Sequence, residues 1–184
     1  MIRLFTAVPI PAEIRYTLHA MGQSLPGAKA VAEEQIHITL RFIGEVEGSI
    51  YKDIQERLHS VEAPSFSVGI QGVGHFPPRG KPRVLWAGLQ PTDELIRLKR
   101  KIDTCLIDCG LPPDNRKFSP HVTIARIAGS PLQRVTRFLA GNAFLQFDAF
   151  PVDSFNLYSS KLSSKGARHT IEARYPLNTG NLTF

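Results

Sequence analysis

Two histidine–threonine pairs carry the chemistry that this sequence suggests. His37 is followed by Thr39 in the segment HITL, and His121 is followed by Thr123 in HVTI, although the chain holds only 6 histidines. Alternate side chains of a β-strand share a face, so each pair would present an imidazole and a hydroxyl together, backed by aliphatic residues. Two such strands facing each other would form a cleft suited to acid–base chemistry on an anionic oxygen.

The surroundings of the two motifs also repeat, which argues against two unrelated half-buried strands. In the first half, the pattern predicts strands over Arg3–Ile10, Ile36–Ile43 and Phe66–Phe76, with helices beginning at Pro11 and Ser49. In the second half, it predicts strands over Arg83–Leu89, Phe118–Ile127, Phe147–Tyr158 (one strand, or two broken at Pro151) and His169–Leu177, with helices beginning at Thr92 and Ser130. The order of elements recurs with a period of roughly 84 residues, which suits two related lobes.

These elements predict an α+β, bilobal and duplicated fold. We expect two mostly antiparallel sheets with outer helices around a central cleft, related by a pseudo-two-fold axis. The sequence repeats run roughly over residues 1–82 and 83–177, within a single domain of 184 residues.

The composition indicates what kind of partner the protein binds and in which cellular compartment it works. The net charge of +6 and the isoelectric point near 9.6 favour an anionic partner. The two cysteines, Cys105 and Cys109, lie four apart in a helical pattern and read as small buried residues, which fits a reducing compartment. No signal peptide and no membrane span is expected, so the sequence predicts a cytoplasmic protein.

The stretches QIHITLRFIG and SPHVTIAR resemble the paired His-x-Thr-x signatures of the two-histidine (2H) phosphoesterases. Within that superfamily the chain is most similar to the RNA 2′,3′-cyclic phosphodiesterases, also called 2′-5′ RNA ligases or LigT-like proteins. The segments RLFTAV, PAEIR and RVLWAGL fit the same family. The resemblance implies a metal-free reaction without a cofactor, with His37 as proton donor to the leaving 3′ oxygen and His121 as proton acceptor from water.

The substrate implied by the resemblance is RNA or a nucleotide ending in a 2′,3′-cyclic phosphate, and the protein is expected to act as a monomer. Thr39 and Thr123 would hydrogen-bond the non-bridging phosphate oxygens, where charge develops in the transition state. Four further residues are weaker candidates for substrate contact, and each has an ordinary structural alternative: Phe42, Arg126, His75 and Tyr158. Two basic loops, residues 79–83 and 161–168, are candidates for contact with the RNA backbone.

Other functions remain open at this stage. A non-catalytic module that binds RNA ends would use the same basic cleft, but arginine or lysine would serve pure anion binding better than histidine. A zinc hydrolase would need a third protein ligand, and no third histidine or carboxylate recurs with the repeat. Ligation of a 2′,3′-cyclic phosphate to a 5′-hydroxyl end uses the same chemistry, with a ribose hydroxyl in place of water.

Overall fold

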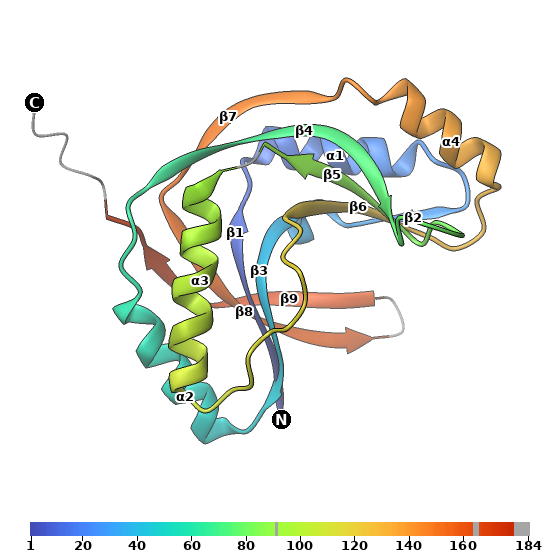
Figure 1. Ribbon diagram of the computed structural model, residues 1–184. Coiled ribbons are helices and arrows are strands. Elements are labelled where there is room, and N and C mark those ends of the chain that lie inside the picture. The colour runs from blue at the N-terminus through green and yellow to red at the C-terminus, as the bar shows by residue number, and fades with distance from the viewer. Residues whose placement is uncertain (91, 164–165, 179–184) are drawn as a thin grey trace, which may run out of the picture.

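A computed structural model describes residues 1–90, 92–163 and 166–178 of the chain (Figure 1). Its helices are α1 (Ala12–Gln23), α2 (Gly48–Arg57), α3 (Asp93–Asp108) and α4 (Leu132–Gly141), with 3₁₀ turns over Glu33–Gln35 and Leu58–Ser60. Its strands are β1 (Ile2–Pro9), β2 (Ala28–Ala30), β3 (His37–Val46), β4 (Phe66–Phe76), β5 (Val84–Leu89), β6 (His121–Ile127), β7 (Gln146–Val152), β8 (Ser154–Ser163) and β9 (Gly166–Pro176). No helix of the described residues is long and apolar enough to cross a membrane.

The strands form one curled antiparallel sheet in the order β7-β4-β5-β6-β3-β1-β8-β9, with β2 paired to β6. The predicted α+β class with antiparallel strands is confirmed. The two sheets expected from the sequence are joined into one, because the motif strands β3 and β6 meet edge to edge at Ile38 and Val122. Figure 1 shows β4 to β7 arching over the upper half of the molecule, with β1, β3, β8 and β9 below.

Each half of the sheet takes strands from both halves of the sequence. Strand β4 leaves the first half of the chain and pairs with β5, whereas β8 comes from the second half and pairs with β1. The pairing is driven by burial, since the inward residues of β4 and β8, such as Ile70 and Phe155, belong to the main apolar core. The spatial halves of the sheet therefore differ from the sequence repeats.

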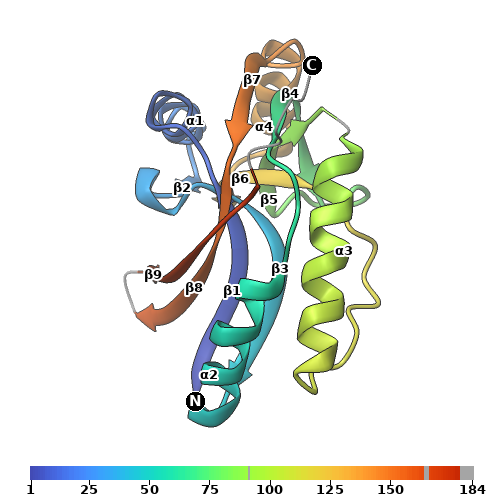
Figure 2. The ribbon, with the colours of Figure 1, turned by 90° about the vertical axis from the view of Figure 1, so that its left-hand side faces the viewer.

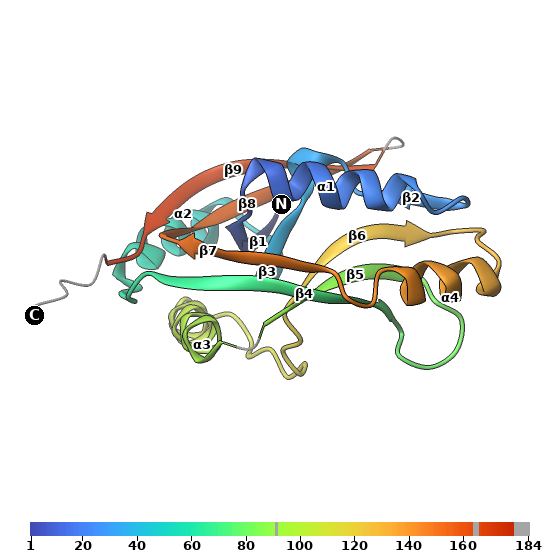
Figure 3. The ribbon, with the colours of Figure 1, turned by 90° about the horizontal axis from the view of Figure 1, so that it is seen from above.

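Apolar stripes dock the helices on the sheet. In α3, Leu95, Leu98 and Ile102 are fully buried at helical spacing, and the Thr92 hydroxyl caps the helix by accepting a hydrogen bond from the Leu95 amide at 3.1 Å. Figures 2 and 3 show α1 and α3 on opposite sides of the sheet. None of the described residues that line the cavity over the motif strands belongs to α1, α2, α3 or α4.

Several local predictions were wrong. Helix α2 begins at Gly48 without a serine cap. The Ser130 hydroxyl donates to the Pro26 carbonyl at 2.6 Å instead of capping α4. The break between β7 and β8 falls at Asp153 rather than at Pro151. The short strand β2 was not predicted, because three residues carry no readable alternation.

The predicted basic loop over residues 161–168 is largely strand. Strands β8 and β9 continue their pairing out to Ser163 and Gly166, so the segment forms the end of a long hairpin. Ser164 and Lys165 lie outside the described residues. Composition favoured a loop here, but antiparallel pairing overrides composition once the partner strand is present.

Candidate active site

The two motif strands share one irregularity, which shapes the site. In the β1–β3 pair, Thr6 lies opposite Arg41 and Ala7 opposite Thr39, so Leu40 is an extra residue in β3. In the β5–β6 pair, Leu85 lies opposite Ala125 and Trp86 opposite Thr123, so Ile124 is an extra residue in β6. Each strand therefore carries a β-bulge at the fourth residue of its motif.

Each bulge turns the residue three positions after the threonine onto the same face as the threonine. The first seven residues of β3 and the seven of β6 show the same order of burial, with histidine and threonine half-buried and two consecutive buried residues after the threonine. Phe42 and Arg126 follow those buried pairs and are exposed again. In an ideal strand Arg126 would face away from His121, as the sequence alone suggests. The bulge at Ile124 instead turns Arg126 onto the face of Thr123.

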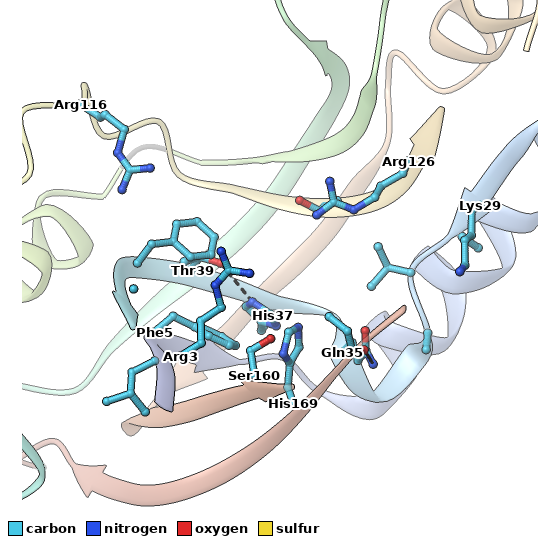
Figure 4. A pocket seen from close by; sticks show the side chains of 18 residues that line it. Arg3, Phe5, Lys29, Gln35, His37, Thr39, Arg116, Arg126, Ser160 and His169 are labelled. Atoms are coloured by element: carbon cyan, nitrogen blue, oxygen red, sulfur yellow. Dashed lines mark hydrogen bonds between the residues drawn. The ribbon is translucent and has the colours of Figure 1, made fainter. Parts of the chain in front are cut away.

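A cavity of about 600 Å³ lies over this face. Among its lining residues are five of the candidates from the sequence: His37, Thr39, Phe42, Thr123 and Arg126. Other side chains that line it were not singled out from the sequence: Arg3, Phe5, Lys29, Gln35, Arg116, Ser160 and His169. Figure 4 shows that these groups come from several strands, with Arg116 and Arg126 at opposite ends of the view and His37 and His169 between them.

His37 lies in a tightly packed aromatic environment. Its ring stacks on Phe5 with the centroids 4.9 Å apart, and the rings of Tyr158 and His169 lie 5.8 and 5.7 Å away. The Nε2 atom lies 3.1 Å from the Thr39 hydroxyl oxygen. Burial lowers the pKa of His37 to about 4, assisted by the nearby His169 and opposed by a hydrogen bond to the Gln35 carbonyl, with a smaller lowering effect from His121. In the free protein at neutral pH, His37 is therefore uncharged.

His121 has a more open setting on the other motif strand. Its Nδ1 atom lies 2.7 Å from the Ser119 carbonyl oxygen, two residues earlier, just as the ring of His37 bonds to the carbonyl of a residue two positions before it. A carbonyl accepts only from a protonated nitrogen, so this bond places a proton on Nδ1 of His121 and leaves Nε2 available for another partner. The rings of Phe76 and Trp86 flank it at 4.9 and 6.5 Å. His121 does not line the 600 Å³ cavity in this structure.

Two of the weaker candidates lie outside the cavity. Tyr158 is only 9% exposed, because its ring stacks under Phe5 at 5.0 Å, and its hydroxyl accepts a hydrogen bond from the Asn156 amide at 3.1 Å. That position supports His37 from behind and offers little surface for a base. His75 is half-buried in β4 opposite Leu85 and does not line the cavity either.

A buried arginine ties the first motif strand to the connection that leads into the second. The Nη1 atom of Arg41 lies 3.3 Å from the Asp114 carboxylate and 3.8 Å from the Asp103 carboxylate, and its Nη2 atom donates to the Pro112 carbonyl at 2.6 Å. Arg116, in the same connection, places its guanidinium 5.9 Å from the centroid of the Phe42 ring. This network thus holds the connection that carries Arg116 at one end of the cleft. The sequence indicated none of it, since a charge inside a strand ordinarily faces solvent.

Metal ligation and thiol chemistry find no support in the described residues. No three His, Cys, Asp or Glu side chains within residues 1–90, 92–163 and 166–178 converge as a metal site would require. Cys105 and Cys109 are free thiols, and burial raises the pKa of Cys105 to about 11, which keeps it uncharged.

The site is thus a cavity lined by Arg3, Lys29, Arg116 and Arg126 over the two His-x-Thr strands of one curled antiparallel sheet. Residues 10–162 match the family model described as the 2′-5′ RNA ligase superfamily, and the chain belongs to that family. This confirms the family inferred from the two motifs.

Named relatives agree with this assignment. The chain is 36% identical to the RNA 2′,3′-cyclic phosphodiesterase of Aeropyrum pernix over 140 residues, which cover 75% of this chain and 80% of the relative. It is 34% identical to the enzyme of the same name from Archaeoglobus fulgidus, covering 90% of this chain and 94% of the relative. The crystal structure of Escherichia coli LigT complexed with 3′-AMP superposes with a TM-score of 0.79 at 28% identity, covering 97% and 99% of the two chains.

Proposed function

We propose that the protein hydrolyses 2′,3′-cyclic phosphates at RNA or nucleotide ends to 2′-phosphomonoesters without a metal ion. The observation that carries this proposal is the meeting of the two motif strands at Ile38 and Val122. If the pairing continued in antiparallel register, it would set His37 beside Thr123 and Thr39 beside His121. One phosphoryl group can then meet an imidazole and a hydroxyl from each strand.

The reaction needs one base and one acid on opposite sides of phosphorus. In the proposed assignment His121 accepts a proton from the attacking water, the bond between phosphorus and the 3′ oxygen breaks, and His37 gives its proton to that oxygen. Each group would contribute roughly 10²–10⁴-fold to the rate. The 2′-phosphomonoester is then the product.

His37 is neutral in the free protein, so it can act as proton donor only if bound substrate favours its protonated form. A 2′,3′-cyclic phosphate carries one negative charge, and an anion beside an imidazole favours the protonated form. Binding would therefore raise the pKa of His37 from its value of about 4. Proton uptake on substrate binding is then part of the mechanism.

The cleft also offers contacts on both sides of the reacting group. Arg126 shares the face of Thr123 and would bind a phosphate oxygen, while the Phe42 ring, 56% exposed, can stack on a base. The same site would join a cyclic phosphate to a 5′-hydroxyl end if a ribose hydroxyl replaced water. Thr39 and Thr123 would donate to the non-bridging oxygens in either direction.

The test is an assay on an RNA oligonucleotide that ends in a 2′,3′-cyclic phosphate, in the presence of EDTA. The expected result is formation of the 2′-phosphate by the wild type, with rates reduced at least ~10²-fold in His37→Gln and His121→Gln. His59→Gln is the matched control, because His59 is exposed and its ring packs on Tyr175, outside the cavity. Urea unfolding of each variant would show that the fold is retained.

Other outcomes would change the proposal. Folded wild-type protein that binds the RNA tightly without turnover would favour the non-catalytic binding module. Turnover that EDTA abolishes would contradict the metal-free mechanism. A 3′-phosphate product would reverse the choice of leaving oxygen, and full activity in either motif-histidine variant would remove that residue from the catalytic pair.

A further inference from the structure

A third histidine stands beside the proposed proton donor. His169 lies in β9, opposite Ser160 of β8, and both side chains line the cavity. The His169 ring meets the His37 ring edge-on with the centroids 5.7 Å apart, and it meets Phe5 in the same way at 4.8 Å. The Nδ1 atom of His169 is buried and has no hydrogen-bond partner among the described residues. Figure 4 shows the two imidazoles side by side at the floor of the site.

Gln35 holds both histidines in place. Its backbone carbonyl accepts a hydrogen bond from the His37 ring, and its side-chain amide donates to the Ala167 carbonyl, two residues before His169. The start of β9 is therefore tied to the start of the motif strand β3. The contact between the two imidazoles follows from the fold and from this bridge, rather than from two freely rotating surface side chains.

We propose that His169 is a positioning residue whose charge determines when His37 takes up its proton. Two imidazoles this close do not readily carry two positive charges, so they titrate as a coupled pair. This proposal concerns the free protein, and its consequence for turnover rests on the cyclic phosphodiesterase function proposed above.

The electrostatic effect of His169 on His37 supports this role. Burial is the main cause that lowers the pKa of His37, and the charge on His169 is the next cause. The pKa of His169 is lowered by burial alone. A protonated His169 therefore opposes protonation of His37. The negative charge of a bound phosphate offsets that opposition, which would link the charging of His37 to the presence of substrate.

Other ionisable groups lie on the elements around the pair. The ionisable groups on the surrounding elements are Arg3, Lys29, Arg116, His121, Arg126, Tyr158 and Arg168. None of the described residues that line the cavity is Asp or Glu, so no carboxylate there neutralises the imidazoles. Among the described residues that line the cavity, His169 is the imidazole whose ring contacts the ring of His37.

The direct test is an NMR titration of the histidine ring signals in the protein without substrate. In His169→Gln the midpoint of His37 is expected to move upward from about 4, because the opposing charge is gone. In the matched control His59→Gln the midpoint stays where it is in the wild type. An unchanged His37 midpoint in His169→Gln overturns the proposal. If His169→Gln unfolds, His169→Asn serves the same comparison, with urea unfolding to verify the fold.

The kinetic test is the pH dependence of kcat/KM on the cyclic-phosphate oligonucleotide. The acid limb of the profile is expected to move to higher pH in His169→Gln. If His37 is the proton donor, kcat/KM at pH 7 rises as well, because more of His37 is protonated. If His37 is the base, kcat/KM at pH 7 is unchanged. A shift of the acid limb, with or without a rise of kcat/KM at pH 7, supports the coupling of His169 to His37. A lower kcat/KM with an unshifted pH profile overturns it. An inactive wild type would contradict the proposed function, while the NMR titration would still show whether His169 and His37 titrate as a coupled pair.

Discussion

The two motif strands have the same shape but different surroundings. Both carry a bulge at the fourth motif residue and the same order of burial, and both histidines bond to a carbonyl two residues earlier. His37, however, packs against Phe5, Tyr158 and a second imidazole, whereas the described aromatic rings that His121 contacts are Phe76 and Trp86. A nearly symmetric backbone thus places the two histidines among different side chains, and this difference supports the unequal proton-transfer roles proposed for them.

The residues that follow the two bulges differ in the same way. Phe42 and Arg126 occupy equivalent positions, but one offers an aromatic face and the other a cation. Behind them, the buried positions are occupied by Arg41 in the first strand and Ala125 in the second. The cleft is therefore asymmetric at both ends, which would give a bound RNA end one preferred direction.

The largest expected effect comes from removing the buried arginine. Arg41→Met should lower the free energy of unfolding by about 3 kcal/mol, because Asp103 and Asp114 lose their buried partner. Urea unfolding measures this. Arg97→Met is the matched control, since the exposed Arg97–Asp93 pair should be worth less than about 1 kcal/mol. Equal losses in the two variants would refute a structural role for Arg41.

The next largest effect is expected from removing the hydroxyl of either motif threonine. Thr39→Val and Thr123→Val should each lower kcat about 10²-fold with a smaller change in KM, because each removes a donor to the developing phosphate charge. The serine variants at the same positions should keep most of the activity, since they keep the hydroxyl. Thr39→Val also removes the partner of Nε2 of His37, so its pH profile should change more than that of Thr123→Val. Two equal responses would show that the halves of the site are equivalent.

A smaller effect separates the two ends of the cleft. Phe42→Ala should raise KM about 10-fold with little change in kcat, since base stacking is worth roughly 1–3 kcal/mol. Arg126→Gln should also raise KM, but this effect should shrink as salt is added, because a phosphate contact is screened. Steady-state kinetics at two salt concentrations measure both. Salt dependence of the Phe42→Ala effect, or its absence for Arg126→Gln, would contradict the assignment of the two ends.

Much of this arrangement is readable from the sequence, because helical and strand periodicity are local signals. Strand β4 and the two His-x-Thr pairs were predicted at the residues where the structure has them. The bulges were not, because one extra residue leaves two consecutive inward positions, and a charged residue such as Arg41 at the second position reads as outward. His169 was missed for another reason. It enters the site through pairing of β9 with β8, a contact that no local spacing records.

The smallest effect tests whether Tyr158 supports His37 or touches the substrate. Its ring lies behind Phe5 and outside the cavity, so Tyr158→Phe should keep KM and kcat within about two-fold of the wild type. The loss of the hydrogen bond from Asn156 should cost about 1 kcal/mol of unfolding free energy. Kinetics on the cyclic-phosphate oligonucleotide and urea unfolding measure the two quantities. A clear rise in KM without a loss of stability would instead place Tyr158 against the substrate, and the aromatic packing behind His37 would then be part of the binding surface.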